Sequence, residues 1–341
     1  MKKVKFMGTN QEVSCACLGT MLMGTAINKT DSFTILDDYI DRGGNFIDTA
    51  NCYCWWLGDS NSYGDESETL LGDWITQNKN RDKIFLATKF GGRLTDPKKV
   101  RSANGDIIWE NVVGEYEGAS AKVIKADIEG SLKRLKTDYI DLYYVHVDDR
   151  KTPLEETLSA LSDLVKEGKV KNIGCSNMRT WRIANAREIS RRNGFPLFKA
   201  VQQEYSYIRQ NISADRGITF SADDELFDYM KSNEDMTLVA YSPLLKGIYA
   251  GEERRKKYYD WNSFNNGESI ERLQVIEKMS EESGISGNQL VLAWLLHKKP
   301  SVIPILGFSK ISQYKENVEA LSISLTDEQM NILNKGKLVI A

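Results

Sequence analysis

The chain has 341 residues, of which 41% are hydrophobic and 27% charged, and its formal net charge is −3. This charge balance excludes a strongly basic nucleic-acid surface. No apolar run approaches the roughly 20 residues of a membrane span. The start of the chain, Met1 to Phe6, carries charges with no apolar signal segment behind them. The five cysteines, an odd number without any sign of secretion, favour reduced thiols in a cytoplasmic protein.

Apolar strands alternate with amphipathic helices along the whole chain. Residues 4–7 and 11–14, around Gly8-Thr-Asn10, are typical of a β-hairpin. The strands that we expect after the hairpin are 13–18, 45–48, 84–89, 139–146, 170–177, 198–203, 238–241 and 301–304. The helices that we expect are one capped by Thr30-Asp31, then 67–78, 120–135, 153–167, one ending near 192, 222–232, 269–283, 287–298, 310–319 and a last one starting at Thr326.

Eight strands with right-handed helical crossovers predict an α/β fold, a (β/α)8 TIM barrel formed by residues 1–341 as one domain, with an N-terminal hairpin and two extra helices. Three connections are too long to be simple turns, and all of them follow strands: 50–66, 91–119 and 242–268. They belong at the carboxyl-end face of the barrel, where aromatic side chains would wall a pocket. Trp55 and Trp56 are the substrate-contact candidates, although such residues also brace their own loops.

Four polar side chains stand at or just past the carboxyl ends of apolar runs. Asp48 closes one strand, Tyr53 follows in the next loop, Lys89 ends another strand, and His146 ends a third. Each alone is usually a solvated or core residue, but the set is typical of a barrel active site. A phenol has an ordinary pKa of about 10, and a nearby ammonium would lower it. We therefore expect Lys89 to lower the pKa of Tyr53, and His146, next to a cation, to stay neutral.

These residues stand in segments that closely resemble the aldo-keto reductases. The segments are Gly44-Asn-Phe-Ile-Asp48-Thr-Ala-Asn-Cys-Tyr53, the strand end Thr88-Lys89, and Asp141-Leu-Tyr-Tyr-Val-His146. The resemblance extends from about residue 3 to residue 335. It implies that Asp48, Tyr53, Lys89 and His146 are the catalytic residues of a reversible aldehyde or ketone reduction. One departure is Cys54, since the family usually has glycine after the tyrosine.

The resemblance also implies a nicotinamide dinucleotide across the barrel mouth, because none of the four groups can supply a hydride. No Gly-x-Gly-x-x-Gly follows any strand, so the usual dinucleotide-fold signature is absent. The cofactor-binding residues that the resemblance predicts are Gly19, Thr20, Met21, Asp48, Ser176, Asn177, Gln202, Tyr241, Ser242, Pro243, Leu244, Lys246, Gly247, Gly307, Ser309, Lys310, Gln313, Glu316 and Asn317.

The cofactor that we expect is NADP, with NADPH favoured over NADH. Ser309 and Lys310 come at a helix start, where backbone donors and a cation suit a 2′-phosphate. Many relatives place a further arginine or lysine in this segment, where this chain has Phe308 and Gln313.

Two other functions compete with the reductase. Some members of the family are redox-sensing regulatory subunits of channels, and this chain would suit that role too, although it lacks a long partner-binding tail. A metal-dependent hydrolase is disfavoured because only His146 and His297 are available as imidazole ligands. Structural zinc is disfavoured as well, because Cys15-x-Cys17 and Cys52-x-Cys54 lack the usual ligand spacing. We expect Cys15 and Cys17 to share one face of a strand.

The expected partner is a small-molecule carbonyl or alcohol, either a sugar or an aromatic compound.

Overall fold

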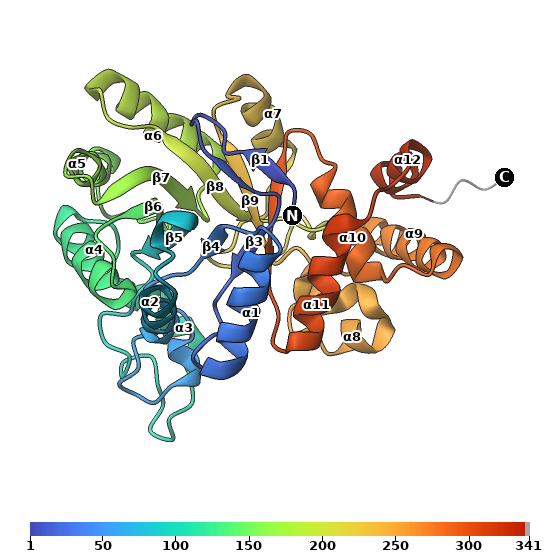
Figure 1. Cartoon of the computed structure of the whole chain (residues 1–341), viewed down its shortest axis with the longest axis horizontal. Helices are drawn as coiled ribbons and strands as arrows, with labels where there is room; N and C mark the ends of the chain where they lie inside the picture. The colour runs from blue at the N-terminus through green and yellow to red at the C-terminus, as the bar shows by residue number, and fades with distance from the viewer. Residues whose placement is uncertain (338–341) are drawn as a thin grey trace.

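The computed structural model describes residues 1–337 and shows a closed parallel barrel in the strand order β10-β3-β4-β5-β6-β7-β8-β9 (Figure 1). The hairpin strands are β1 (Lys3–Lys5) and β2 (Glu12–Ser14). The barrel strands are β3 (Cys17–Gly19), β4 (Phe46–Asp48), β5 (Phe85–Phe90), β6 (Ile140–Val145), β7 (Val170–Ser176), β8 (Phe198–Glu204), β9 (Thr237–Tyr241) and β10 (Val302–Leu306). The predicted TIM barrel with an N-terminal hairpin is confirmed.

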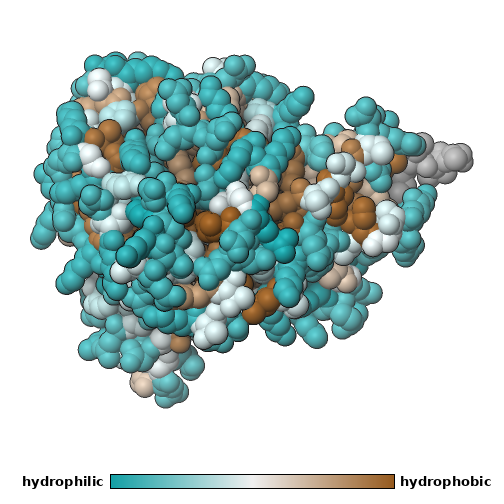
Figure 2. Space-filling view, in the orientation of Figure 1, coloured by the Kyte–Doolittle hydropathy of each residue, from teal (hydrophilic) through white to brown (hydrophobic). Residues whose placement is uncertain are grey.

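The helices form a layer outside the barrel. They are α1 (Lys29–Asp41), α2 (Glu66–Asn78), α3 (Trp109–Val112), α4 (Ala121–Leu135), α5 (Leu154–Lys166), α6 (Thr180–Asn193), α7 (Asp224–Ser232), α8 (Glu252–Lys256), α9 (Gly267–Ser283), α10 (Gly287–Leu296), α11 (Ile311–Glu319) and α12 (Asp327–Lys335). The face shown in Figure 2 is mainly hydrophilic, with smaller apolar areas between the polar side chains. No helix within residues 1–337 is long and apolar enough to cross a membrane.

The hairpin closes the amino-terminal end of the barrel. Phe6, which follows β1, packs with its ring centroid 4.9 Å from that of Phe85 and 6.2 Å from that of Phe46, residues that begin β5 and β4. The backbone N–H of Met7 donates to the hydroxyl of Thr237, the first residue of β9, at 2.9 Å. The hairpin therefore covers this end, and the carboxyl end of the barrel is where the fold usually holds its active site.

Several sequence-based boundaries differ from the structure. The expected strand 13–18 is interrupted: β2 ends at Ser14 and β3 begins at Cys17, so Cys15 and Cys17 do not share a strand face, although both are buried. The first helix is capped by Asn28, whose side chain accepts from the N–H of Asp31, and not by Thr30-Asp31. The eighth barrel strand is Val302–Leu306 and not 301–304. The long loops contain two short helices that periodicity could not reveal, α3 and α8.

Candidate active site

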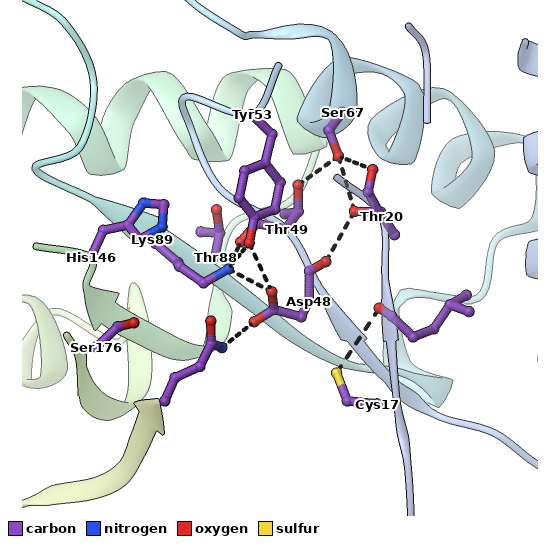
Figure 3. Close-up of polar contacts among 12 residues, drawn as sticks. Cys17, Thr20, Asp48, Thr49, Tyr53, Ser67, Thr88, Lys89, His146 and Ser176 are labelled. Atoms are coloured by element: carbon purple, nitrogen blue, oxygen red, sulfur yellow. Dashed lines mark hydrogen bonds and ion pairs between the residues drawn. The ribbon is translucent and has the colours of Figure 1, made fainter. Parts of the chain in front are cut away.

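The barrel brings the four predicted polar residues together at the carboxyl ends of neighbouring strands (Figure 3). Asp48 is the last residue of β4, and its register partner on β5 is Ala87, two residues before Lys89. Because side chains alternate along a strand, Ala87 and Lys89 project to the same side. His146 directly follows β6, and its backbone N–H donates to the carbonyl of Phe90 at 3.0 Å. Parallel pairing therefore places residues far apart in sequence around one point.

The ammonium of Lys89 lies at the centre of this group and is fully buried. Its Nζ donates to Oδ1 of Asp48 at 2.5 Å, to the backbone carbonyl of Thr49 at 2.7 Å, and to the phenol oxygen of Tyr53. An ammonium has three protons, so each one has an acceptor. The second carboxylate oxygen of Asp48 accepts from Nε2 of Gln202 at 2.8 Å. These contacts fix both charges in one arrangement.

The phenol of Tyr53 has a raised pKa, which corrects the expectation that Lys89 would lower it. Burial, followed by the nearby Asp48 carboxylate, raises the pKa of Tyr53 well above its ordinary value. At the phenol, burial and the carboxylate of Asp48 outweigh the ammonium of Lys89, because both disfavour a buried phenolate. The phenol is consequently protonated at neutral pH, which suits a proton donor.

His146 stands edge-on to Tyr53, with the ring centroids 5.9 Å apart and an interplanar angle of 80°. Burial and the positive charge of Lys89 lower the pKa of His146 to about 3. Its imidazole is therefore neutral across the physiological range, as we expected. A neutral imidazole has one N–H to donate. The phenol O–H of Tyr53, which here donates to Oδ1 of Asp48 at 3.2 Å, can turn to the same acceptor as that N–H.

The predicted nicotinamide-binding residues extend this polar rim over the next strands. The hydroxyl of Tyr241, at the end of β9, donates to Oδ1 of Asn177 at 2.7 Å. The Nδ2 of Asn177 donates to Oγ of Ser176 and to the carbonyl of His146, both at 3.2 Å. Gln202 differs from the others because its amide nitrogen is bound to Asp48. Side chains at the ends of β7 and β9 thus form one hydrogen-bonded row, which also reaches the backbone carbonyl of His146.

The loop after β9 has an unusual backbone. Ser242, Leu245, Lys246 and Gly247 all have positive φ, between 44° and 87°. Three of them are not glycine, and such strained backbone is concentrated at functional sites. A Cβ added at Gly307 would meet nothing within 4 Å, and one at Gly247 would meet only Asn288, 3.9 Å away. The loop after β9 and the residue that follows β10 therefore leave room for a ligand to approach the backbone closely.

The remaining predicted cofactor residues lie at the edges of the same face. Thr20 is buried and donates to the carbonyl of Asp48 at 3.0 Å, while Gly19 and Met21 flank it at the end of β3. Pro243 and Leu244 belong to the strained loop, where the Pro243 carbonyl accepts from Ser206 at 2.6 Å.

At the start of α11, the backbone N–H and hydroxyl of Ser309 both donate to Oε1 of Gln313. Lys310 is exposed, and it has no carboxylate within 4.0 Å among residues 1–337. The carboxylate of Glu316 accepts from Ser286 at 2.6 Å, and Asn317 is buried and donates to the Gly307 carbonyl at 3.1 Å.

The two substrate-contact candidates have different surroundings. Trp55 is buried in a small apolar cluster between the first two long loops, and Trp56 is partly exposed with its ring 5.9 Å from that of Trp55. The ring centroid of the exposed Trp109 lies 6.0 Å from that of Trp55. Cys54 has a φ of 64°, which explains why glycine is common at this position. The three indoles form one aromatic group, and Tyr53 packs against the apolar cluster that contains Trp55.

Two arginines that organise these loops were missed by sequence reasoning. Arg101 donates to the carbonyls of Trp55 and Gly58 at 3.2 and 2.9 Å, and so joins the first long loop to the second. Arg216 binds the carboxylate of Glu204 and, through Nε, that of Asp260 at 2.7 Å. The only sequence signal was Glu204 itself, another charged residue at a strand end. Its partners are in irregular loops without periodicity.

No group of three or more His, Cys, Asp and Glu side chains within the described chain, residues 1–337, is arranged to hold a metal ion.

Comparisons with known proteins agree with this geometry. The model of the aldo/keto reductase family matches residues 16–336. The norsolorinic acid reductase of Emericella nidulans is 32% identical over 331 residues, which cover 93% of this chain and 76% of that protein. The NADP(+) aryl-alcohol dehydrogenase of Phanerodontia chrysosporium is 31% identical over 324 residues, 92% of this chain and 77% of that protein. The crystal structure of the thermostable aldo-keto reductase Tm1743 superposes with a TM-score of 0.69 and 26% identity, covering 98% of this chain and all of the other.

Proposed function

The chain belongs to the aldo/keto reductase family of oxidoreductases, and from this we propose that it reversibly reduces an aromatic aldehyde or ketone to the alcohol with NADPH. The single observation that carries the proposal is the triple contact of the buried Lys89 ammonium, which binds Asp48, the Thr49 carbonyl and the phenol of Tyr53. Members of this family generally use NAD(P)H. A bound nicotinamide dinucleotide would supply the hydride that reaches the carbonyl carbon.

The protein's own residues would handle the proton and the developing charge. Tyr53, protonated because its pKa is raised, gives its proton to the carbonyl oxygen. The ammonium of Lys89 already donates to the phenol oxygen and stabilises the phenolate left behind. Neutral His146 donates its remaining N–H to the same carbonyl oxygen and orients it. In alcohol oxidation the steps reverse, and the phenolate of Tyr53 is the base.

The residues at the mouth fit a nicotinamide dinucleotide. The row of Ser176, Asn177 and Tyr241 offers amide and hydroxyl groups to a carboxamide. The positive-φ backbone of residues 242–247 is the kind of turn whose N–H groups cradle phosphate oxygens. Lys310, exposed and without a carboxylate partner in the described part of the chain, supports NADPH over NADH because only NADPH carries a 2′-phosphate.

Two features favour an aromatic substrate over a sugar. Trp55, Trp56 and Trp109 form an indole cluster, and Tyr53 packs against the apolar residues around Trp55. Flat rings stack on indole with offset or edge-on geometry. In addition, the similar proteins named above act, by their names, on aromatic alcohols and on norsolorinic acid.

A substrate panel tests the proposal. The purified chain should consume NADPH, followed at the absorbance of the reduced nicotinamide, with aromatic aldehydes more efficiently than with straight-chain aldehydes or aldose sugars of similar size. Tyr53→Phe measured in parallel separates turnover at this site from contaminating activity. NADPH binding without turnover of any carbonyl would favour a redox-sensing regulatory subunit instead, and higher kcat/KM for aldoses would refute the aromatic assignment.

A further inference from the structure

A buried thiol contacts the imidazole of the site. Sγ of Cys52 lies 3.5 Å from Nδ1 of His146, and Cys52 is only 5% exposed. The other ring nitrogen, Nε2, has no hydrogen-bond partner among the described residues, and the His146 side chain is partly exposed. The imidazole is thus held through one nitrogen while the other remains available.

We propose that Cys52 is a positioning residue, whose thiol donates a hydrogen bond to Nδ1 of His146 and thereby places the ring proton on Nε2, where it can be donated to the substrate oxygen. This proposal rests on the carbonyl-reducing function proposed above. It assigns a part in the reaction to the residue that immediately precedes the proton donor Tyr53.

The direction of the hydrogen bond follows from what each group can donate and accept. A neutral imidazole has one N–H donor and one acceptor nitrogen. If Nδ1 carried the proton, Nε2 would have only a lone pair and would repel a carbonyl oxygen. Burial raises the pKa of the Cys52 thiol to about 12, so it keeps its proton and can donate it. With S–H directed to Nδ1, both groups are satisfied and the N–H remains for the substrate.

The surrounding backbone enforces the contact. A Cβ built on Gly92 would lie 3.0 Å from Nδ1 of His146 and 3.4 Å from Sγ of Cys52. The chain at Gly92, which is buried, therefore packs directly against the pair, and the ring has little freedom to rotate away from the thiol. A side chain at this position would push the ring or the thiol out of place.

The tautomer can be observed directly, because His146 and His297 are the only histidines in the chain. The full-length protein, labelled with 15N-histidine, would be examined by long-range 1H–15N correlation, with His297→Gln to assign the signals. We expect neutral His146 in the wild type with its proton on Nε2. In Cys52→Ala the signal should move toward a mixture of tautomers, and in Cys52→Ser, whose hydroxyl can also donate, it should return to the wild-type pattern.

Kinetics on the same variants give a second readout. A neutral hydrogen bond of about 0.5–1.5 kcal/mol corresponds to a roughly 2- to 10-fold change in rate. We expect kcat for carbonyl reduction to fall by this factor in Cys52→Ala and to recover in Cys52→Ser. Cys15→Ala is the matched control, since it removes another buried thiol at the opposite end of the barrel and should change neither the tautomer nor kcat.

Several outcomes would overturn the proposal. A wild-type proton on Nδ1 would mean that the thiol is the acceptor. An unchanged tautomer in Cys52→Ala, or equal losses of kcat in the alanine and serine variants, would make Cys52 a packing residue. Failure of the reductase proposal is seen separately, because it would appear as the absence of carbonyl turnover, or as turnover that does not depend on Tyr53, while the tautomer measurement stands unaffected.

Discussion

Lys89 and Asp48, on the adjacent strands β5 and β4, form an ion pair of 2.5 Å in which both side chains are almost completely buried. Removing two charges from water costs several kcal/mol per ion, and the attraction between them often only offsets that cost. The pair is therefore poorly explained as a source of stability. Its position explains it better, because the ammonium also reaches the phenol of Tyr53.

Tyr53→Phe should abolish most of the activity while leaving the fold and the cofactor site intact. The phenyl ring keeps the edge-on packing against His146 but has no proton to give. General acid catalysis contributes about two to four orders of magnitude, so kcat for carbonyl reduction should fall by roughly that factor. NADPH affinity, measured by quenching of protein fluorescence, should stay within about twofold. Near-wild-type turnover would remove Tyr53 from the mechanism.

The parts of the fold and site that rest on repeating patterns were accessible from the sequence. Strand-ending polar residues such as Asp48, Lys89 and His146 could be placed because parallel barrel strands bring their carboxyl ends to one face. The sign of the net shift in the pKa of Tyr53 could not be deduced, because it depends on the burial of the phenol and on how close the carboxylate of Asp48 lies, and both raise the pKa.

The parts that depend on irregular backbone were not accessible. Arg101 and Arg216 act through loop carbonyls and a carboxylate brought near by tertiary folding. The contact between Cys52 and His146 joins residues 94 positions apart. No period of 2 or 3.6 residues marks such positions, so only the folded geometry reveals them.

Lys310→Glu should change cofactor selectivity. The lysine stands at the N-cap position of α11 and is exposed. A 2′-phosphate bound there would lose a charge-assisted hydrogen bond worth about 1.5–3 kcal/mol, or roughly ten- to hundred-fold in affinity. Titration with NADPH should show this loss, whereas NADH binding should change little. Lys335→Glu, which makes the same change of charge at the end of α12, is the control. Equal weakening of both cofactors would place Lys310 near the pyrophosphate or give it a structural role.

Arg216→Met should destabilise the protein more than an exposed substitution does. Arg216 is almost buried and binds the buried carboxylate of Glu204 and also Asp260. Removing one partner of a buried pair leaves an uncompensated charge, at a cost of about 3–5 kcal/mol. Urea unfolding followed by circular dichroism measures the change, with the exposed Lys231→Met as the matched control. If the urea unfolding midpoint shifted no more than in the control, the carboxylate of Glu204 would have become hydrated instead of remaining buried and unpaired.

In Glu117→Gln, the free energy of unfolding should fall less as the pH rises than it does in the wild type. Burial and the neighbouring Asp127 raise the pKa of Glu117 to about 7, above its ordinary value of 4.5. Because the folded state holds this proton more tightly than the unfolded chain, the stabilisation is present below pH 4.5 and is lost as the pH rises toward 7. The difference between the urea unfolding midpoints at pH 5 and at pH 7.5 should be smaller in the variant than in the wild type. Parallel pH profiles for the two proteins would contradict the assignment.

Lys89→Met tests the electrostatic part of the mechanism, since methionine keeps an apolar stem of similar length and removes only the ammonium. The phenol of Tyr53 would lose its hydrogen bond from Nζ, and the uncompensated carboxylate of Asp48 would oppose phenolate formation further. Both changes raise the pKa of Tyr53. Alcohol oxidation, which needs the phenolate as base, should therefore collapse at neutral pH, and its rise with pH should begin at least about one unit higher than in the wild type.

The double variant Asp48→Asn with Lys89→Met distinguishes an electrostatic effect of losing the ammonium from a simple loss of folded protein. It removes the unpaired carboxylate, so it should recover thermal stability relative to Lys89→Met alone, while oxidation stays slow because no cation supports the phenolate. The measurements are the pH dependence of alcohol oxidation and of aldehyde reduction in all three proteins. If the oxidation profile of Lys89→Met kept its wild-type position and only cofactor affinity fell, Lys89 would serve to position the cofactor. The phenol would then require another source of stabilisation for its anion.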